Sequence, residues 1–295
     1  MRRPGPLLLL VVVTAVWGYT FVPVQKAVGA FPLFTFLALR FAVSAVVLAP
    51  FAAAPLRRLP RSGYLAGLGT GALLALAYGL QTAGLQLTTV SSTGFITGLY
   101  VVLTPLLALA LFRTPVPRAA SLGVALSLVG LLLLSGIPGG SIYGNALVLG
   151  NAAAQALQIA LMERFAPRYD ARALTFLQMA VATGGFFVIA AGRGELAWPH
   201  TGVVWYAIFV TGIFAGAFGY LVATWVQART TAARAALVFT LEAPFAALFG
   251  VVLLSERLGW TGWTGCAVML AGIVIAQPAA AGTLRRLVGR PAVGA

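Results

Sequence analysis

The sequence predicts an all-α polytopic membrane protein with ten transmembrane helices, arranged as two inverted five-helix repeats. Three observations lead to this prediction: a charge-poor composition, ten apolar runs of membrane-spanning length, and an ordered internal repeat. Of the 295 residues, 61% are hydrophobic and only 8% are charged, whereas soluble domains carry roughly 25% charged residues. So few charged groups cannot cover a water-facing globule, and the outer surface is therefore expected to face lipid.

Ten apolar runs follow one another along the chain with short connections. A helix needs about 20 residues to cross about 30 Å of hydrocarbon, and each run is close to that length. The first run begins after two arginines, as a signal peptide does, but it continues without a convincing cleavage site and is interpreted as a retained span. The runs lie at 7–29, 32–53, 64–85, 91–112, 119–136, 144–163, 172–192, 203–225, 234–254 and 262–280.

The two halves of the chain match each other at an offset of about 140 residues. Because five is odd, the second half enters the membrane from the opposite face, and transporters built in this way place the substrate site near the midplane. We expect a first repeat over 1–138, a second repeat over 139–281 and a short basic cytoplasmic tail over 282–295. The matched features are Trp17/Lys26 with Gln155/Arg164, Leu39–Val43 with Leu177–Val181, Tyr64/Tyr78 with Tyr206/Tyr220, Pro105 with Pro244, and Gly123/Gly130 with Gly265/Gly272.

The net charge of +14 is distributed unevenly. If ten spans are threaded from a cytoplasmic start, Lys26, Arg193 and Arg257 fall outside and Arg40 lies within a span. An excess of basic residues on one side marks the cytoplasmic side, so both termini are expected there. This distribution indicates a membrane lipid environment and no nucleic acid partner. The other fifteen of the 19 basic residues fall on the cytoplasmic side: Arg2, Arg3, Arg57, Arg58, Arg61, Arg113, Arg118, Arg164, Arg168, Arg172, Arg229, Arg234, Arg285, Arg286 and Arg290.

Polar side chains recur at helical spacing within several spans. Such stripes should face away from lipid, because an unpaired polar group in hydrocarbon is costly. They either form hydrogen bonds between helices or line a water-accessible cavity, and their presence on several helices favours the cavity. With Trp17 as an aromatic wall and Arg40 as a charged group, the candidate substrate-binding residues are Trp17, Arg40, Tyr78, Gln81, Thr97, Tyr100, Gln155, Gln158, Tyr220 and Thr224.

Two charged residues lie inside predicted spans. A charge at a helix centre costs about 2.5–3.5 kcal/mol on insertion scales, so Arg40 needs a partner or a wet pathway. It either clamps a carboxylate or phosphate of the substrate, or pairs structurally with Glu242 or with helix-end carbonyls. Glu242 is the only acid near the middle of a span. It is a candidate proton-coupling residue, with helix capping at Pro244 or an ion pair as the alternatives.

The ordered residues of the two halves resemble the drug/metabolite transporter superfamily, EamA type with ten helices. Trp17-Gly18, Lys26, Pro32 and Arg40-Phe41 resemble the opening of an EamA repeat, and Glu242-Ala243-Pro244, Ser255-Glu256-Arg257-Leu258 and Gly265 through Gly272 resemble its closing pattern. The first half departs from the pattern, with Thr104-Pro105 and Arg113 in place of the two acids, so a role of those acids is not duplicated. The resemblance implies export or exchange of small metabolites, such as amino acids, across the bacterial inner membrane.

The leading hypothesis is therefore a secondary transporter that moves an amino acid, or a similar zwitterion or anion, by alternating access, with the proton as candidate coupling ion. The alternatives are a transporter of phosphorylated or cationic amphipathic molecules, and a channel-like or structural membrane component. No glycine-rich phosphate loop followed by Lys-Thr or Lys-Ser is present. An enzyme is not expected, because the acids are scattered and His200 is the single histidine. The lone Cys266 gives no disulfide, and no metal or cofactor is expected. The substrate, the direction of transport and the oligomeric state stay open.

Overall fold

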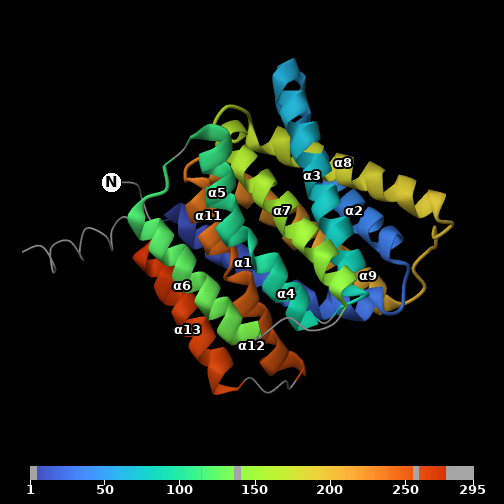
Figure 1. Cartoon of the computed structure of the whole chain (residues 1–295). Coiled ribbons are helices and arrows are strands. Elements are labelled where there is room, and N and C mark those ends of the chain that lie inside the picture. The colour runs from blue at the N-terminus through green and yellow to red at the C-terminus, as the bar shows by residue number, and fades with distance from the viewer. Residues whose placement is uncertain (1–4, 89, 114, 136–140, 255–258, 277–295) are drawn as a thin grey trace, which may run out of the picture.

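The computed structural model describes residues 5–88, 90–113, 115–135, 141–254 and 259–276, and all regular elements in these ranges are helices. The predicted tail 282–295 and the motif residues Ser255–Leu258 lie outside them. The first half comprises α1 (Gly5–Val28), α2 (Leu33–Arg57), α3 (Arg61–Leu85), α4 (Val90–Gly98), α5 (Tyr100–Phe112) and α6 (Arg118–Ser135). The second half comprises α7 (Ile142–Phe165), α8 (Ala171–Gly192), α9 (Gly202–Phe209), the π-helix η1 (Val210–Gly219), α10 (Tyr220–Gln227), α11 (Ala232–Phe239), α12 (Glu242–Leu254) and α13 (Trp260–Ile275), as Figure 1 shows.

These helices confirm the predicted fold class. Within the described ranges, eight continuous or interrupted helices are long and apolar enough to cross a membrane, and two shorter apolar helices, α6 and α13, complete the ten predicted spans. The outward surface is apolar, with Val46, Leu65, Val188 and Val252 between 63% and 73% exposed. Polar side chains such as Asn151 lie inside instead. This distribution is the one that a lipid-facing surface requires.

The fourth and ninth spans are each interrupted near their middle, within runs that the sequence predicted as single membrane spans. The break between α4 and α5 falls at Leu99, and Pro105 follows within α5. The break between α11 and α12 comprises Thr240 and Leu241. Pro244 explains the second break, because a proline cannot donate to the carbonyl four residues earlier and its ring crowds that carbonyl. The carbonyl of Thr240 accepts from the Ala243 amide instead, at 3.2 Å.

The eighth span contains the π-helical segment η1 between α9 and α10. Two of its carbonyls accept hydrogen bonds from side chains of other helices. Ser44 Oγ of α2 donates to the Gly212 carbonyl at 2.7 Å, and Trp17 Nε1 of α1 donates to the Ala215 carbonyl at 3.0 Å. A Cβ at Gly216 would lie 2.0 Å from Ser44 Oγ, so glycine is required for this close approach. These two carbonyls accept hydrogen bonds from other helices, and this is compatible with the i→i+5 hydrogen-bond pattern of the π-helix, which is wider than that of an α-helix.

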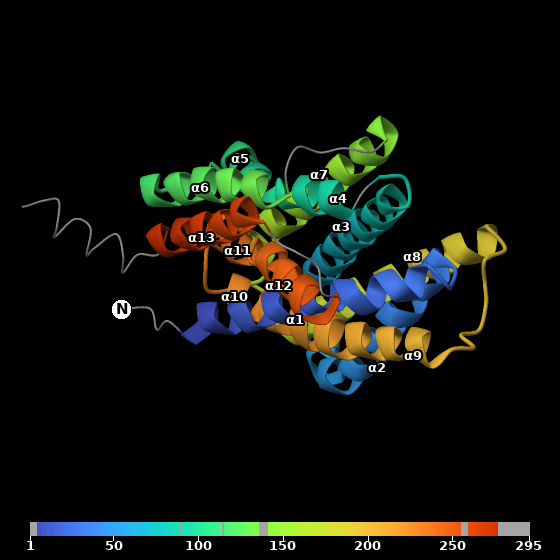
Figure 2. The same cartoon turned by 90° about the horizontal axis from the view of Figure 1, so that it is seen from below.

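The last helices of the two halves, α6 and α13, lie side by side at one edge of the bundle (Figures 1 and 2). A Cβ at Gly123 would lie 2.6 Å from the Gly272 carbonyl oxygen, and a Cβ at Gly130 would lie 2.6 Å from that of Gly265. The pairing of an early glycine with a late one shows that the two helices run antiparallel. Because these helices are equivalent elements of the two halves, their antiparallel contact confirms that the repeat is inverted.

We call the face of the bundle at which α1 begins the entry face, and the face at which α1 ends the far face. The predicted arginine clusters of the described residues fall at helix ends on the entry face, for example Arg57 at the end of α2 and Arg118 at the start of α6. Near this face α5 packs against α11. By contrast, α4 and α12, the far-face halves of the same two spans, are not among the helix pairs in extensive contact. The bundle is thus closed toward the entry face and more open toward the far face.

Candidate functional site

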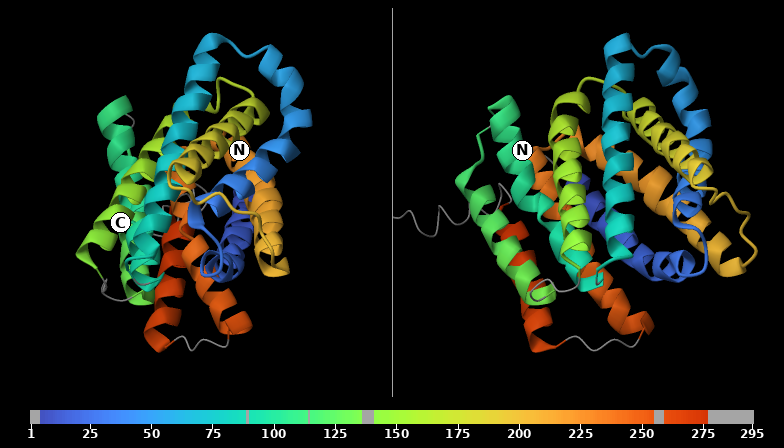
Figure 3. Two further views of the ribbon diagram at one scale, coloured as in Figure 1. Left: turned by 90° about the vertical axis from the view of Figure 1, so that its right-hand side faces the viewer. Right: turned by 45° about the vertical axis from the view of Figure 1, so that its right-hand side comes forward.

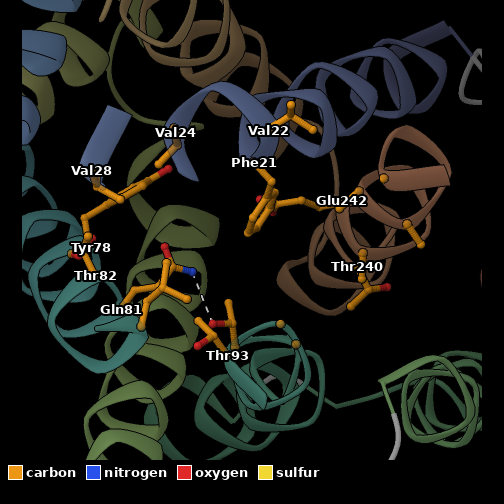
Figure 4. Close-up of a pocket in the computed structure, with 18 of the residues that line it drawn as sticks. Phe21, Val22, Val24, Val28, Tyr78, Gln81, Thr82, Thr93, Thr240 and Glu242 are labelled. Carbon is orange, nitrogen blue, oxygen red and sulfur yellow. Dashed lines mark hydrogen bonds between the residues drawn. The ribbon is translucent and has the colours of Figure 1, made fainter. Parts of the chain in front are cut away.

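A cavity of about 290 Å³ lies between the two halves. Its walls come from α1, α2, α3, α4, α6 and α12 and from Tyr100 at the start of α5, and the close-up in Figure 4 looks into it. The lining includes Val28, Leu85 and Leu134, which lie at or next to the far-face ends of α1, α3 and α6. It also includes mid-span residues such as Arg40. The cavity therefore runs from the middle of the bundle toward the far face.

Six of the eleven residues singled out from the sequence line this cavity. They bring together positive, negative and neutral polar groups in a mainly apolar chamber, whose wall includes Phe21, Phe36 and Leu37. In Figure 4 Tyr78, Gln81 and Thr82 extend from α3 on one side, and Phe21 and Glu242 lie across from them. The six residues are Arg40, Tyr78, Gln81, Thr97, Tyr100 and Glu242.

Arg40 lies on α2 and is only 6% exposed. Its guanidinium carbon lies 5.2 Å from the centre of the Phe41 ring and 5.1 Å from that of Tyr78. A Cβ at Gly212 would lie 2.8 Å from the Arg40 carbonyl oxygen, so η1 packs directly against the turn of α2 that contains Arg40. Among the described residues, Arg40 and Glu242 form no ion pair although they line the same cavity. Aromatic faces stabilise the cation without neutralising it.

Glu242 is the first residue of α12 and therefore lies at a helix N-terminus in the middle of a span. The free amides and the dipole of a helix N-terminus stabilise a nearby negative charge. Gly18 of α1 makes this placement possible, because a Cβ there would lie 2.9 Å from the Glu242 carbonyl oxygen and 2.6 Å from the Phe245 Cβ. The Trp17-Gly18 motif thus allows α1 to pack directly against the first turn of α12.

Thr97 connects three helices at the cavity wall. Its hydroxyl oxygen accepts from Gln81 Nε2 at 3.2 Å and from Asn151 Nδ2 at 2.9 Å. These bonds join α3, α4 and α7, which belong to both halves of the chain. Thr97 and Gln81 therefore serve both interpretations of the polar stripes, since they bond between helices and also line the cavity.

A tyrosine pair bounds the cavity toward the entry face. Tyr220 Oη of α10 and Tyr78 Oη of α3 are 3.1 Å apart and share a hydrogen bond between the two halves. Trp17 packs with tilted rings against Tyr220 and Phe239, with ring centres 5.2 Å and 5.4 Å apart, respectively. The aromatic cluster separates the main cavity from a second, much smaller one.

The second cavity, of about 20 Å³, lies on the entry-face side of the tyrosine pair. Three glutamines line it. Gln158 Nε2 donates to Gln178 Oε1 at 2.8 Å. Gln227 is 5% exposed, and its Nε2 is buried without a hydrogen-bond partner among the described residues. The volume is sufficient for about one water molecule. The predicted residues that line this second cavity are Trp17, Tyr78, Gln155, Gln158 and Tyr220.

Thr224 lines neither cavity. Its hydroxyl accepts from Thr175 Oγ1 at 3.1 Å, and both side chains are buried between α8 and α10. The fourth predicted span also carries Thr104, four residues after Tyr100. Thr104 lies on α5 together with Tyr100, but it is fully buried and lines neither cavity, and its hydroxyl has no hydrogen-bond partner among the described residues. Thr224 thus forms the inter-helix hydrogen bond that was the alternative interpretation of the stripes, whereas Thr104 fits neither interpretation.

Several lining residues were not among those singled out. Phe21, Phe36 and Leu37 give no signal in the sequence, because an apolar residue inside an apolar span can equally face lipid. Thr82, Thr93 and Gln227 belong to the polar stripes and could have been included on that ground. Thr240 has a weaker signal: it lies four residues before Pro244, where the proline opens the backbone.

An inverted pair of five-helix units around a midplane cavity with a buried charge defines a membrane transporter fold. The model of the EamA-like transporter family matches residues 5–136 and 142–276, so the chain belongs to this family. A protein of Archaeoglobus fulgidus described as an uncharacterized transporter is 29% identical over 269 residues, which cover 90% of this chain and 83% of the relative. A solved crystal structure superposes with a TM-score of 0.79 at 19% identity, over 97% of this chain and 99% of the other, and it supports the fold alone.

Proposed function

We propose that this transporter is a secondary carrier of a small zwitterion, such as an amino acid, and that it works by alternating access. The observation that carries the proposal is the pair of unneutralised opposite charges, Arg40 and Glu242, on the wall of one cavity between the halves. A zwitterion satisfies both charges at once. Its carboxylate accepts from the Arg40 guanidinium, and its ammonium group donates to Glu242.

The remaining wall fits a small substrate with an apolar side chain. Pockets for drug-sized ligands measure roughly 300–1,000 Å³, and the volume of about 290 Å³ lies just below that range. Phe21, Phe36 and Leu37 would contact an apolar side chain. A phosphorylated metabolite would bind Arg40 and leave the Glu242 carboxylate without a positive partner. A cationic amphipath would bind Glu242 and leave Arg40 without a negative partner. The presence of both charges therefore favours the zwitterion over these alternatives.

The distribution of arginines supports a cytoplasmic entry face, with both termini on that side of the inner membrane. In this orientation the main cavity faces outward. Packing of α5 against α11, together with the Tyr78–Tyr220 hydrogen bond, would close the cytoplasmic side. In the opposite state α4 would approach α12, and the tyrosine pair would separate. The second cavity would then widen and receive the substrate from the cytoplasm at Gln155 and Gln227, which gives a route for export or exchange.

Counterflow in proteoliposomes tests the carrier hypothesis. Vesicles loaded with an unlabelled amino acid should transiently accumulate the same labelled amino acid from outside, at least about tenfold above protein-free vesicles, because a carrier exchanges bound solutes. A channel-like protein would let the label equilibrate without a transient excess, which would contradict the proposal. Transport of phosphorylated metabolites but of no zwitterion would assign the cavity to the alternative substrate class.

Thiol labelling in intact cells tests the orientation. In a Cys266→Ala background, Thr97→Cys should react with a membrane-impermeant reagent from outside, roughly tenfold faster than Gln155→Cys, because only the main cavity reaches the far face. Thr224→Cys is the matched control, since Thr224 is buried beside Thr175 away from both cavities. Faster reaction at Gln155→Cys would place the open cavity on the cytoplasmic side and would contradict the proposed orientation.

A further inference from the structure

A second concave surface lies on the entry face, away from the transport cavities. It is a groove of about 490 Å³ between the end of α2, the turn that leads to α3, and the connection from α7 to α8. Figure 3 shows that turn beside the start of α8 at the upper edge of the molecule. The groove therefore bridges the two halves of the chain.

The upper part of the groove is basic. Arg58 lies in the α2–α3 turn, and Arg168 and Arg172 lie in and after the α7–α8 connection. Asp170 is the one acid among the residues that line the groove, and it is bonded to Arg172, with the two groups 2.8 Å apart. The hydrogen bond and charge of Arg172 hold the pKa of Asp170 below its usual range, so this pair stays ionised. Arg58 and Arg168 are exposed and form no ion pair within the described ranges.

The lower part of the groove is apolar and faces the lipid side of α2. Pro50, Phe51 and Ala54 line it, and Phe51 is 54% exposed. From Pro50 to Arg58 the helix axis rises about 12 Å at 1.5 Å per residue. The groove thus presents a cationic end at the membrane surface and an apolar end about one headgroup depth below it.

We propose that this groove binds one anionic glycerophospholipid, with its phosphate between Arg58 and Arg168 and the start of an acyl chain along Phe51 and Ala54. Basic pockets between transmembrane helices on the cytoplasmic side suit anionic headgroups. A free phosphate would use only the arginines and would leave the apolar end empty. Because the groove joins α2 of the first half to the α7–α8 connection of the second, the bound lipid links the two halves at the face that is closed in this structure.

The test uses the purified full-length chain in detergent, titrated with dioleoylphosphatidylglycerol, with dioleoylphosphatidylcholine for comparison. Thermal unfolding and native mass spectrometry report binding. Phosphatidylglycerol is expected to raise the unfolding temperature and to remain bound, and phosphatidylcholine is not. Arg58→Gln/Arg168→Gln should weaken the apparent affinity by about 10- to 30-fold. Arg118→Gln/Arg229→Gln, which removes the same charge elsewhere on the entry face, should change it by less than about twofold.

A second variant keeps the charges and removes the space. Ala54→Trp should fill the apolar end and reduce phosphatidylglycerol binding by about tenfold, with the basal unfolding temperature unchanged because Ala54 is exposed. If Arg118→Gln/Arg229→Gln lost as much phosphatidylglycerol affinity as Arg58→Gln/Arg168→Gln does, the binding would depend on the overall surface charge rather than on the groove. That result would overturn the proposal. An equal shift with inorganic phosphate, or unaltered binding to Ala54→Trp, would assign the site to a free anion and would also overturn it.

Discussion

Replacing Arg40 with methionine is expected to lower amino acid counterflow by about 10- to 150-fold, while the protein remains at least as stable as the wild type. The loss corresponds to one charge-assisted hydrogen bond to the substrate carboxylate, worth about 1.5–3 kcal/mol. Arg40 is only 6% exposed and lines the main cavity, so we expect no other positive group to take over its hydrogen bond to the substrate carboxylate. Counterflow at a substrate concentration below KM measures this loss.

The expected stability has a separate origin. A charge inside a span costs about 2.5–3.5 kcal/mol, and the two aromatic faces beside Arg40 return about 0.5–2 kcal/mol each. These contributions nearly cancel, so removal of the charge leaves the free energy of unfolding unchanged or raises it. The Arg40→Met protein should therefore unfold in detergent at or above the wild-type temperature.

Lys26→Met is the matched control, because it removes one positive charge at the exposed far-face end of α1. It should keep counterflow within about twofold of the wild type. If Arg40→Met instead unfolded several degrees lower, Arg40 would belong to a structural pair. If it transported as the wild type does, the carboxylate clamp would be wrong.

Replacing Glu242 with glutamine is expected to abolish accumulation driven by a pH gradient, with a loss of at least about tenfold, while counterflow persists. If Glu242 is the proton-coupling residue that the sequence suggests, the substrate ammonium and the coupling proton compete for its carboxylate. Glutamine cannot carry a proton, but its Oε1 still accepts a hydrogen bond from the ammonium group. KM should therefore rise by several-fold and should no longer depend on pH.

The pH dependence of KM separates coupling from simple binding. In the wild type, a lower pH protonates Glu242 more often, so KM for the zwitterion should rise as pH falls. In Glu242→Gln it should stay flat. Glu163→Gln is the control, since Glu163 lies on α7 away from both cavities and accepts from the Ala232 amide at 3.1 Å. Gradient-driven uptake by Glu242→Gln at the wild-type rate would place the coupling proton on another group.

The candidate site was partly predictable from the sequence. A polar residue inside an apolar run must face the protein interior, which pointed to Arg40, Gln81 and Glu242 before any contact was known. The same rule cannot distinguish a cavity wall from an inter-helix bond. Thr224 follows the rule as well as Thr97 does, yet it faces Thr175 rather than a cavity.

By itself the sequence determined the ten spans, their two-fold repeat and the side on which the arginines gather. These features follow from the hydrocarbon, which requires long apolar runs and internally bonded backbone whatever the neighbours are. Only the tertiary structure decided where the spans break and how the polar residues divide between two cavities. Those outcomes depend on which helices approach closely, at Gly18 against α12 and at Gly212 against Arg40. Such contacts join residues far apart in the chain, and helical periodicity along one span contains no information about them.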